Sequence, residues 1–358
     1  MSGPMATAGE MRAWRTHAYG QPLEALKLDI VPIPDPGPAE LRVKVQAIPL
    51  NLNDLERITG GNMMVRPELP YSPGMEVMGM VDACGDGSEQ WARRRVVAIP
   101  TGAYGGFAEY AICPVASVFE MPKSIPLPAA AALYFPFHLA WLGLIDRAGL
   151  QEGETVLIHA AAGGSGSAAV QLAVDRGARV FTTASTDEKV RLCQDLGAHV
   201  AMNYNTSDFA EIVLAETDNQ GVDVVFDNVG DAVLEKSLQC TKYNGRYLMM
   251  GFASNKVVAD EKFLVPRRIA LGNLKLCGVL LSYQDPDALN FLKTGMGWNF
   301  IPRELGSRIM DEIISLVHSK RVKPVIGRVV DFEEIPSAID ALAHRETVGR
   351  TIAVMAES

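Results

Sequence analysis

A glycine-rich turn is the segment whose residue types point most directly to chemistry. It reads Ala161-Ala162-Gly163-Gly164-Ser165-Gly166, a GxGxxG pattern with alanine in the first place. It follows a predicted strand, Thr155 to His159, and opens a predicted helix, Ser167 to Arg176. In that context Gly163 lets the backbone approach a pyrophosphate, and Gly166 lets helix and strand pack closely. The turn predicts a dinucleotide site; a tight turn in an unrelated α/β protein and a methyltransferase loop are the alternatives.

The second predicted strand, Ala178 to Thr183, is not followed by the acid that commonly binds the ribose hydroxyls of NAD. Ser185 stands nineteen residues after the last glycine, and Lys189 follows one helical turn later. A carboxylate there would repel a 2′-phosphate, whereas a hydroxyl would not. Ser185 and Glu188 also match a capping box, and Asp187 favours a helix N-terminus electrostatically. Both roles are expected together, and NADPH is the predicted dinucleotide.

The elements that must position these residues are strands alternating with helices after Leu150. The further strands are predicted at His199 to Met202, Val222 to Asp227, Arg246 to Met250 and Leu274 to Leu280. Six strands in this alternation predict a doubly wound parallel sheet.

The preceding region has a different texture. Short alternating runs separated by Pro and Gly clusters predict a mostly antiparallel β domain: Leu41 to Ile48, Met80 to Cys84 and Arg95 to Ile99. A helical run and a short β pattern near the end, Arg308 to Lys320 and Lys323 to Phe332, predict a return to that domain. The predicted organisation is a flexible extension at 1–10, a β domain at 11–135, a nucleotide domain at 136–290 and the returning segment at 291–358.

The stretch from Ser124 to Ile145 has no Asp, Glu, Lys or Arg and is long enough to span a bilayer. Three prolines divide it, so we predict two short buried helices instead. Within it, Tyr134 and His138 are expected to be core residues rather than catalytic ones.

The composition narrows the classes of partner. The 358 residues include 48% hydrophobic and 21% charged residues, as in soluble globular proteins. The net charge of -9 argues against nucleic acid as the principal partner. Five scattered cysteines form no CxxC pair, so neither a disulfide framework nor a zinc ribbon is predicted. The first ten residues do not resemble a signal peptide, and we expect a cytoplasmic protein.

Further motifs occur in a characteristic order around the glycine turn. They are Asn51-x-x-Asp54, Pro73-Gly-Met-Glu76-Val-Met-Gly79, Gly105-Gly-Phe-Ala-Glu-Tyr110 and Gly349-Arg350. Together they resemble the zinc-free quinone oxidoreductase branch of the medium-chain dehydrogenase/reductases, over nearly the whole chain from Met11. The resemblance implies an α/β protein with a Rossmann sheet and a GroES-like β domain.

The resemblance also shows where zinc-dependent relatives hold a catalytic metal. The three matching positions are Asn51, Met75 and, approximately, Phe135. Amide, thioether and phenyl groups do not replace Cys, His or carboxylate ligands, so no zinc is expected. The relatives place an Asn near the nicotinamide, which makes Asn51 the candidate catalytic residue. Stabilisation of a turn is an equally good explanation of Asn51.

Other cofactor contacts are implied by the resemblance, at the ends of the predicted strands. They are Tyr204, Asn228, Gly230, Gly251, Phe252 and Val279. The carboxyl ends of parallel strands are where open α/β sheets bind ligands. Tight turns, a strand-end aromatic and a buried edge strand are simpler explanations of the same residues.

Without a Lewis acid, reduction of an electron-poor acceptor is more economical than alcohol oxidation. We therefore expect an NADPH-dependent reductase of quinones or α,β-unsaturated carbonyls. The alternatives are an enoyl-thioester reductase and a nucleotide-binding protein with little catalysis, like the related lens crystallins. A homodimer is expected from the resemblance, and because the strand at Leu274 to Leu280 forms an exposed sheet edge.

Overall fold

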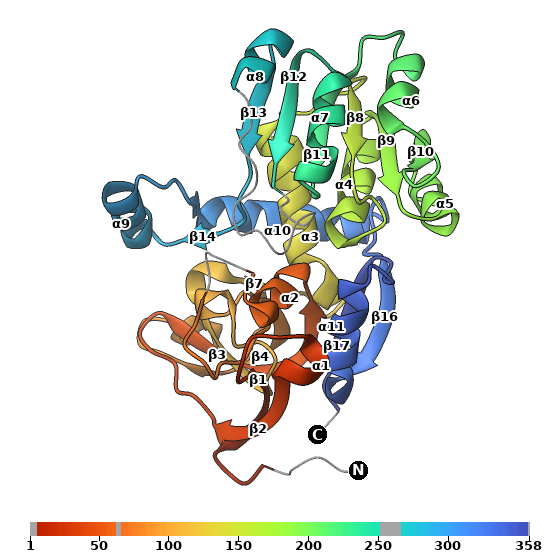
Figure 1. Ribbon diagram of the computed structural model, residues 1–358. Helices are drawn as coiled ribbons and strands as arrows, with labels where there is room; N and C mark the ends of the chain where they lie inside the picture. The colour runs from red at the N-terminus through yellow and green to blue at the C-terminus, as the bar shows by residue number, and fades with distance from the viewer. Residues whose placement is uncertain (1–5, 62–65, 251–265, 357–358) are drawn as a thin grey trace. The chain divides into compact units, whose positions relative to one another are not determined.

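The computed structural model describes residues 6–61, 66–250 and 266–356 and divides into two compact units (Figure 1). The first unit comprises Met1–Tyr134, Ser282–Arg308 and Ile326–Ser358, and the second comprises Phe135–Leu281 and Ile309–Val325. Three parts of the chain are grouped differently from the predicted division, and one of them is the single residue Phe135, which belongs to the second unit. Residues 282–290 group with the first unit, and residues 309–325 group with the second.

The first unit is built on a seven-stranded sheet in the order β16-β17-β3-β4-β5-β7, with β6 also paired to β3. Its strands are β3 (Glu40–Leu50), β4 (Val77–Cys84), β5 (Arg95–Ala98), β6 (Tyr110–Pro114), β7 (Val118–Glu120), β16 (Ile326–Asp331) and β17 (Arg350–Val354). Its strand pairs are antiparallel apart from β16 with β17. The predicted antiparallel character of this domain is confirmed, and β16 and β17 from the C-terminal part of the chain belong to its sheet.

Smaller elements complete the first unit. They are β1 (Glu10–Thr16), α1 (Pro22–Ala25), β2 (Leu26–Pro32), α2 (Leu52–Thr59), β14 (Tyr283–Gln284), α9 (Pro286–Met296), β15 (Ile301–Pro302) and α11 (Ile335–Ala343), with 3-10 turns at Glu89–Trp91, Thr101–Ala103, Val115–Ser117, Ala130–Ala132 and Phe332–Glu334. Helix α10 (Arg303–His318) begins in the first unit and ends in the second.

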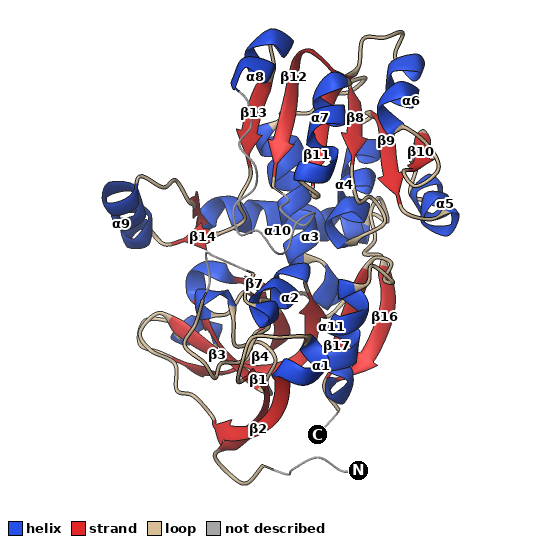
Figure 2. Ribbon diagram, in the orientation of Figure 1, coloured by secondary structure: helices blue, strands red, loops and turns tan. Residues whose placement is uncertain are grey.

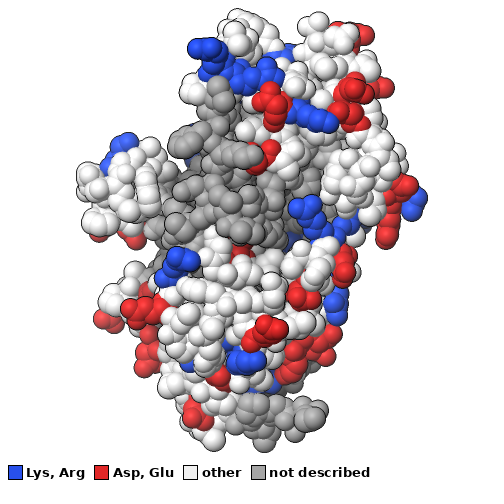
Figure 3. Space-filling model, viewed as in Figure 1, with Lys and Arg blue, Asp and Glu red and all other residues white. Residues whose placement is uncertain are grey.

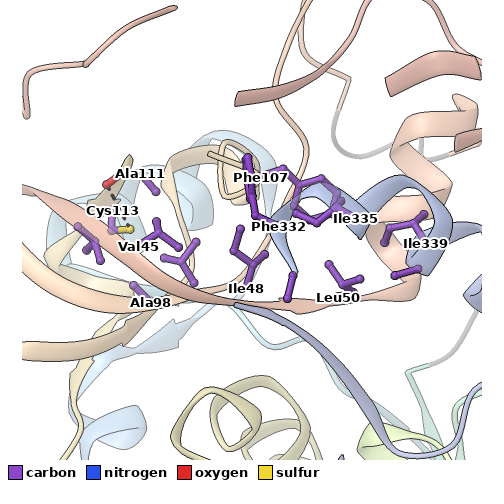
Figure 4. Packing of buried hydrophobic residues seen from close by; sticks show 14 of the residues in the cluster. Val45, Ile48, Leu50, Ala98, Phe107, Ala111, Cys113, Phe332, Ile335 and Ile339 are labelled. Atoms are coloured by element: carbon purple, nitrogen blue, oxygen red, sulfur yellow. Dashed lines mark hydrogen bonds between the residues drawn. The ribbon is translucent and has the colours of Figure 1, made fainter. Parts of the chain in front are cut away.

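The core of the first unit follows from the period of two in β3. Leu41, Val43 and Val45 are buried on one face, whereas Lys44 between them is exposed. The rings of Phe107 and Phe332 pack beside the aliphatic side chains of β3 and α11, as Figure 4 shows. This packing fixes β3, whose last residues lead directly into the motif at Asn51.

The second unit is a six-stranded sheet in the order β10-β9-β8-β11-β12-β13, and all its pairs are parallel (Figure 2). Its strands are β8 (Thr155–Ile158), β9 (Arg179–Ala184), β10 (Val200–Asn203), β11 (Val222–Asp227), β12 (Thr241–Met249) and β13 (Lys275–Gly278). Its helices are α3 (Tyr134–Trp141), α4 (Gly164–Asp175), α5 (Asp187–Asp195), α6 (Phe209–Glu216), α7 (Asp231–Gln239) and α8 (Pro266–Gly272). The predicted doubly wound sheet is confirmed.

The apolar stretch at Ser124 to Ile145 forms a 3-10 turn, helix α3 and a π-helical segment at Leu142–Arg147, in place of two plain helices. Tyr134 and His138 are fully buried, and burial lowers the pKa of His138 to about 3. Among the residues that the structure describes, no helix is long and apolar enough to cross a membrane.

Acidic and basic side chains are interspersed on the face shown in Figure 3, with no broad basic surface among the described residues there. The net charge of the whole chain is -9.

Candidate functional site

The glycine turn joins β8 to α4 in the second unit. Helix α4 begins at Gly164, and its first backbone hydrogen bond runs from the N–H of Ser167 to the carbonyl of Gly163 at 2.9 Å. The N–H groups of the first helical turn, which includes Ser165, therefore face the helix N-terminus. They provide the anion-binding arrangement that a pyrophosphate needs.

Gly166 is required by the packing of this turn. A Cβ atom there would lie 2.2 Å from the carbonyl oxygen of Ala160 and 2.7 Å from the Cα atom of Ala161. At Gly163 the same addition would meet the Ala160 oxygen at 3.3 Å, a contact that a small shift relieves. The close helix–strand approach predicted for Gly166 is therefore present.

The ends of β9 and β10 are linked by amide side chains. Asn205 donates from Nδ2 to the carbonyl of Ser185 at 2.7 Å, and Asn203 donates from Nδ2 to Asp187 at 2.7 Å. Tyr204 donates its N–H to Ala184 and is 40% exposed. Ser185 thus directly follows β9, while Asp187 is held by the neighbouring strand.

The predicted capping box is wrong. The N-cap of α5 is Thr186, whose hydroxyl accepts from the N–H of Lys189 at 3.3 Å. Ser185 lies one residue before the cap and is free of that role, because the strand continues to Ala184. Lys189 is in the first turn of α5 and half-buried.

The loop after β11 is shaped by Asp227. Its Oδ1 atom accepts from the N–H groups of Val229 and Gly230 at 2.7 and 2.9 Å, and its Oδ2 atom accepts from the Tyr247 hydroxyl at 2.7 Å. These bonds fix the backbone on both sides of Asn228. Val279 donates its N–H to Met249 just beyond β13.

Because the six strands are parallel, the candidates that follow their carboxyl ends lie on the same side of the sheet as the glycine turn. We call this side, formed by the carboxyl ends of the strands, the sheet edge; it is distinct from the outermost strand β13. Gly251 and Phe252 lie outside the described residues.

His159 is a buried residue of this edge that the sequence prediction missed. Its Nδ1 atom lies 2.9 Å from the Thr183 hydroxyl and its Nε2 atom 2.8 Å from the Ser237 hydroxyl, which itself donates to Val233. Both ring nitrogens of His159 thus have a hydroxyl partner. Burial lowers the pKa of His159 to about 3, so the ring stays neutral. His159 ties the ends of β8 and β9 to helix α7.

In the first unit, Asn51 belongs to a buried polar cluster. Arg350 in β17 donates to Asn51 Oδ1 at 2.7 Å and to Glu76 Oε2 at 2.5 Å. Asn51 Nδ2 donates to the Pro49 carbonyl at 3.1 Å and to Glu76 at 3.3 Å. The Asn51, Glu76 and Arg350 side chains are almost fully enclosed. Neither Glu76 nor Arg350 was assigned a role from the sequence.

Asp54 holds the backbone around the same cluster. Its two oxygens accept from the N–H groups of Asn51 and Met75, both at 2.9 Å. The guanidinium of Arg57 lies 3.9 Å away. Burial raises the pKa of Asp54 to about 6 against the lowering effects of Arg57 and the two N–H groups. The carboxyl joins the start of α2 to the loop before β4.

Two of the three positions that match zinc ligands in relatives, Asn51 and Met75, lie in this cluster, and Phe135 belongs to the second unit. Among the described residues, no group of three or more His, Cys, Asp or Glu is placed to hold a metal ion.

Comparison with known proteins identifies the family of this chain. Residues 37–123 match the model of the alcohol dehydrogenase GroES-like domain, and residues 164–294 match that of the zinc-binding dehydrogenases. Bovine (Bos taurus) quinone oxidoreductase-like protein 2 is 31% identical over 88% of this chain and 85% of its own. The chain belongs to the quinone oxidoreductase branch of the medium-chain dehydrogenase/reductases.

Two further relatives of this branch cover nearly the whole chain. Human (Homo sapiens) quinone oxidoreductase is 28% identical over 95% of this chain and 96% of its own. The solved structure of mycobacterial Rv1454c complexed with NADPH has a TM-score of 0.81 at 28% identity, covering 96% of this chain and 99% of that one. The resemblance identified from the motifs is therefore confirmed.

Within this member of the quinone oxidoreductase branch, we expect Asp54→Asn to change how stability depends on pH. A carboxyl whose pKa is raised by folding contributes stability that is present below about pH 4 and lost as the pH rises through about 6, by roughly 3 kcal/mol for a shift of this size. The variant lacks that loss, but its amide cannot accept from both N–H groups, which costs about 1–3 kcal/mol. The free energy of unfolding of Asp54→Asn should therefore be lower than that of the wild type, and this difference should become smaller from pH 5 to pH 8.

Urea denaturation across this pH range measures the difference in free energy of unfolding. Asp35→Asn is the control, because the Asp35 side chain is 96% exposed. A deficit that widened with rising pH would show instead that the fold stabilises the ionised form of Asp54.

Proposed function

We propose that the protein is a zinc-independent oxidoreductase that transfers hydride from NADPH to a quinone or an α,β-unsaturated carbonyl compound. The observation that carries the choice of acceptor is the Asn51 cluster. Two positions that match zinc ligands in relatives carry the amide of Asn51 and the thioether of Met75, and neither group ligates zinc. The guanidinium of Arg350 is bound to the Asn51 amide. A site without a Lewis acid suits an acceptor that is already electron-poor.

The residues of the sheet edge fit a dinucleotide. The close contact at Gly166 leaves no room for a side chain, and the free N–H groups of α4 suit phosphate oxygens. Ser185 and Lys189 would hold the adenosine end, with Tyr204 beside them, and Asn228 and Val279 would line the rest. When bound, NADPH supplies the hydride; the chain's own residues orient it and exclude water.

NADPH rather than NADH is favoured by the residues that follow β9. Ser185 carries no charge, and the nearest acid, Asp187, is bonded to Asn203. The complex of the mycobacterial relative with NADPH supports the same choice.

An enoyl-thioester reductase is less well supported. The chain has two basic clusters that could receive such a substrate, Arg93-Arg94-Arg95 and Arg267-Arg268, and three of these five arginines are engaged elsewhere. Arg94 pairs with Glu120, Arg95 donates to the carbonyls of Pro122 and Ile125, and Arg268 pairs with Glu235. Arginines held in this way offer little to an incoming anionic thioester.

The decisive experiment follows NADPH oxidation with three acceptors: a simple quinone, a short enone and an enoyl-CoA. We expect turnover of the quinone or the enone to exceed that of the enoyl-CoA. Turnover confined to the enoyl-CoA would select the thioester reductase, and tight NADPH binding without turnover would indicate a binding protein of the crystallin type.

Metal analysis tests the zinc-independent part of the proposal. Purified protein should contain much less than one zinc per chain, and chelators should leave NADPH oxidation unchanged. A tightly bound, stoichiometric zinc would contradict the mechanism proposed here.

We also propose a homodimer formed at the exposed edge of the second unit. Strand β13 is the last strand of the sheet; Leu276 within it is 40% exposed, and Leu280 just after it is 59% exposed. Sedimentation at micromolar concentration should show a dimer, and Leu276→Lys with Leu280→Lys should shift the protein towards monomer. A wild-type monomer at that concentration would refute this assembly.

A further inference from the structure

The Asn51 amide has little hydrogen-bonding capacity left. Both hydrogens of Nδ2 are directed at acceptors, the Pro49 carbonyl and Glu76, and Oδ1 already accepts from Arg350. An amide has two donors and two lone pairs on oxygen, and the second lone pair of Oδ1 faces the backbone N–H of Asp54 in the capping box that starts α2. The side chain is 5% exposed.

The chemistry of the partners allows only this orientation of the amide. Arg350 can only donate, whereas a carbonyl and a carboxylate can only accept. A flipped amide would direct N–H groups at the guanidinium and its oxygen at two other oxygens. The two charged residues therefore select one of the two amide orientations.

We propose that Glu76 and Arg350 are positioning residues that lock the Asn51 amide in this one orientation. On this proposal, which rests on the proposed function, both N–H groups of the Asn51 amide stay engaged within the protein. Asn51 does not donate to the carbonyl oxygen of the hydride acceptor. The negative charge that develops on that oxygen is thus not stabilised by Asn51.

The charged and titratable groups around Asn51 come from several elements. Asp54 and Arg57 lie in α2, Glu76 precedes β4, Arg350 starts β17, and Tyr134 interacts electrostatically with Glu76. The side chains of Glu76 and Arg350 are 0% and 6% exposed. Removing one of that pair leaves a buried charge without its oppositely charged partner, whereas removing both does not.

Asn51→Asp tests the orientation. The introduced carboxyl faces Glu76 across the same short distance and shares Arg350 with it, so the two carboxyls retain one proton to a higher pH than either alone. The protonated form reproduces the amide, with a donor towards Glu76 and an acceptor towards Arg350. We expect kcat of this variant to rise about tenfold from pH 8 to pH 5. The reason is that the fraction of the protein that retains the shared proton changes by up to tenfold for each unit by which the pH differs from the pKa of the pair.

Two companion variants sharpen this test. Asn51→Ala should have a low kcat without that pH dependence. In Asn51→Asp combined with Glu76→Gln, the new amide donates to the introduced carboxylate, and the pH dependence should disappear. The melting temperature of Asn51→Asp, relative to wild type, should fall as pH rises through the same range, and Glu76→Gln should remove that trend.

A neutral double variant tests the positioning role. Arg350→Met alone should lose stability, and Glu76→Gln with Arg350→Met should recover much of it. The double variant should still show kcat reduced by about a hundredfold, the cost expected for a displacement of about 1 Å at a reacting centre. The control is Arg42→Met with Asp82→Asn, an ion pair on β3 and β4, with Arg42 about 30 Å along the strand from Asn51; its kcat should be unchanged.

The outcomes separate the two proposals. Wild-type kcat in a stable double variant would overturn the positioning role, and a melting temperature of Asn51→Asp that follows wild type at every pH would overturn the amide orientation. If the wild type oxidises NADPH with none of the acceptors, the proposed function fails. The melting-temperature series still decides the orientation of Asn51, because it requires no turnover.

Discussion

Ser185→Asp is expected to lower the NADPH/NADH ratio of kcat/KM by about ten- to hundredfold, corresponding to 1–3 kcal/mol of lost or reversed phosphate binding. The residue directly follows β9, and its carbonyl is anchored by Asn205. A carboxylate there can accept from ribose hydroxyls and would repel a 2′-phosphate. Asp187 cannot substitute for it, because Asn203 holds that carboxylate.

Ser185→Asn is the matched control for this change, because it has nearly the shape of the aspartate and no charge. It should retain the preference for NADPH. Lys189→Ala should weaken NADPH specifically, through the loss of the cation in the first turn of α5. If Ser185→Asp leaves the ratio unchanged, the adenosine ribose binds elsewhere and the assignment of this edge of the sheet must be redrawn.

Gly166→Ala should reduce NADPH affinity about a hundredfold, because the turn and α4 must separate by the order of 1 Å. The new Cβ atom would lie 2.2 Å from a backbone oxygen and 2.7 Å from a backbone carbon, and neither can move without the turn. Overpacking of this kind should also cost about 1–3 kcal/mol of stability.

Gly163→Ala is the informative comparison, since its added atom meets the same oxygen at 3.3 Å. It should retain more stability and lose affinity only so far as the pyrophosphate approaches that residue. Fluorescence titration with NADPH and thermal unfolding with and without it provide both measurements, because a ligand raises the melting temperature of the form it binds. Wild-type affinity in Gly166→Ala would exclude this turn as the phosphate site.

Local patterns in the sequence were sufficient for the second unit. The signals there are local: apolar strands, a glycine turn at fixed spacing and the helix that follows the turn lie close together along the chain. Their order therefore predicted the parallel sheet and the side of it that binds the dinucleotide. The capping residue of α5 was mispredicted by one position, because strand pairing between β9 and β10 carries β9 one residue further than its apolar run.

The buried contacts of the site could not be predicted from local patterns, because the residues that make them are far apart in the sequence. His159 lies at the end of a strand that was predicted, but its partners Thr183 and Ser237 are 24 and 78 residues away. Without them a histidine in an apolar run carries no indication of its charge. Asp54 was visible in the motif with Asn51, yet its bond to Met75 depends on a loop that returns beside α2.

The sequence by itself determined the parallel and antiparallel sheets, the glycine turn, the absence of an acid after β9 and the family. Only the tertiary structure decided that Asn51 is held between Glu76 and Arg350, which are 25 and 299 residues away from it. The glutamate and the arginine were both visible in short motifs, but nothing local pairs them. Their pairing arises because β17 returns to lie beside β3, so that one neutral amide and two charged side chains from three distant segments are buried together and must satisfy one another.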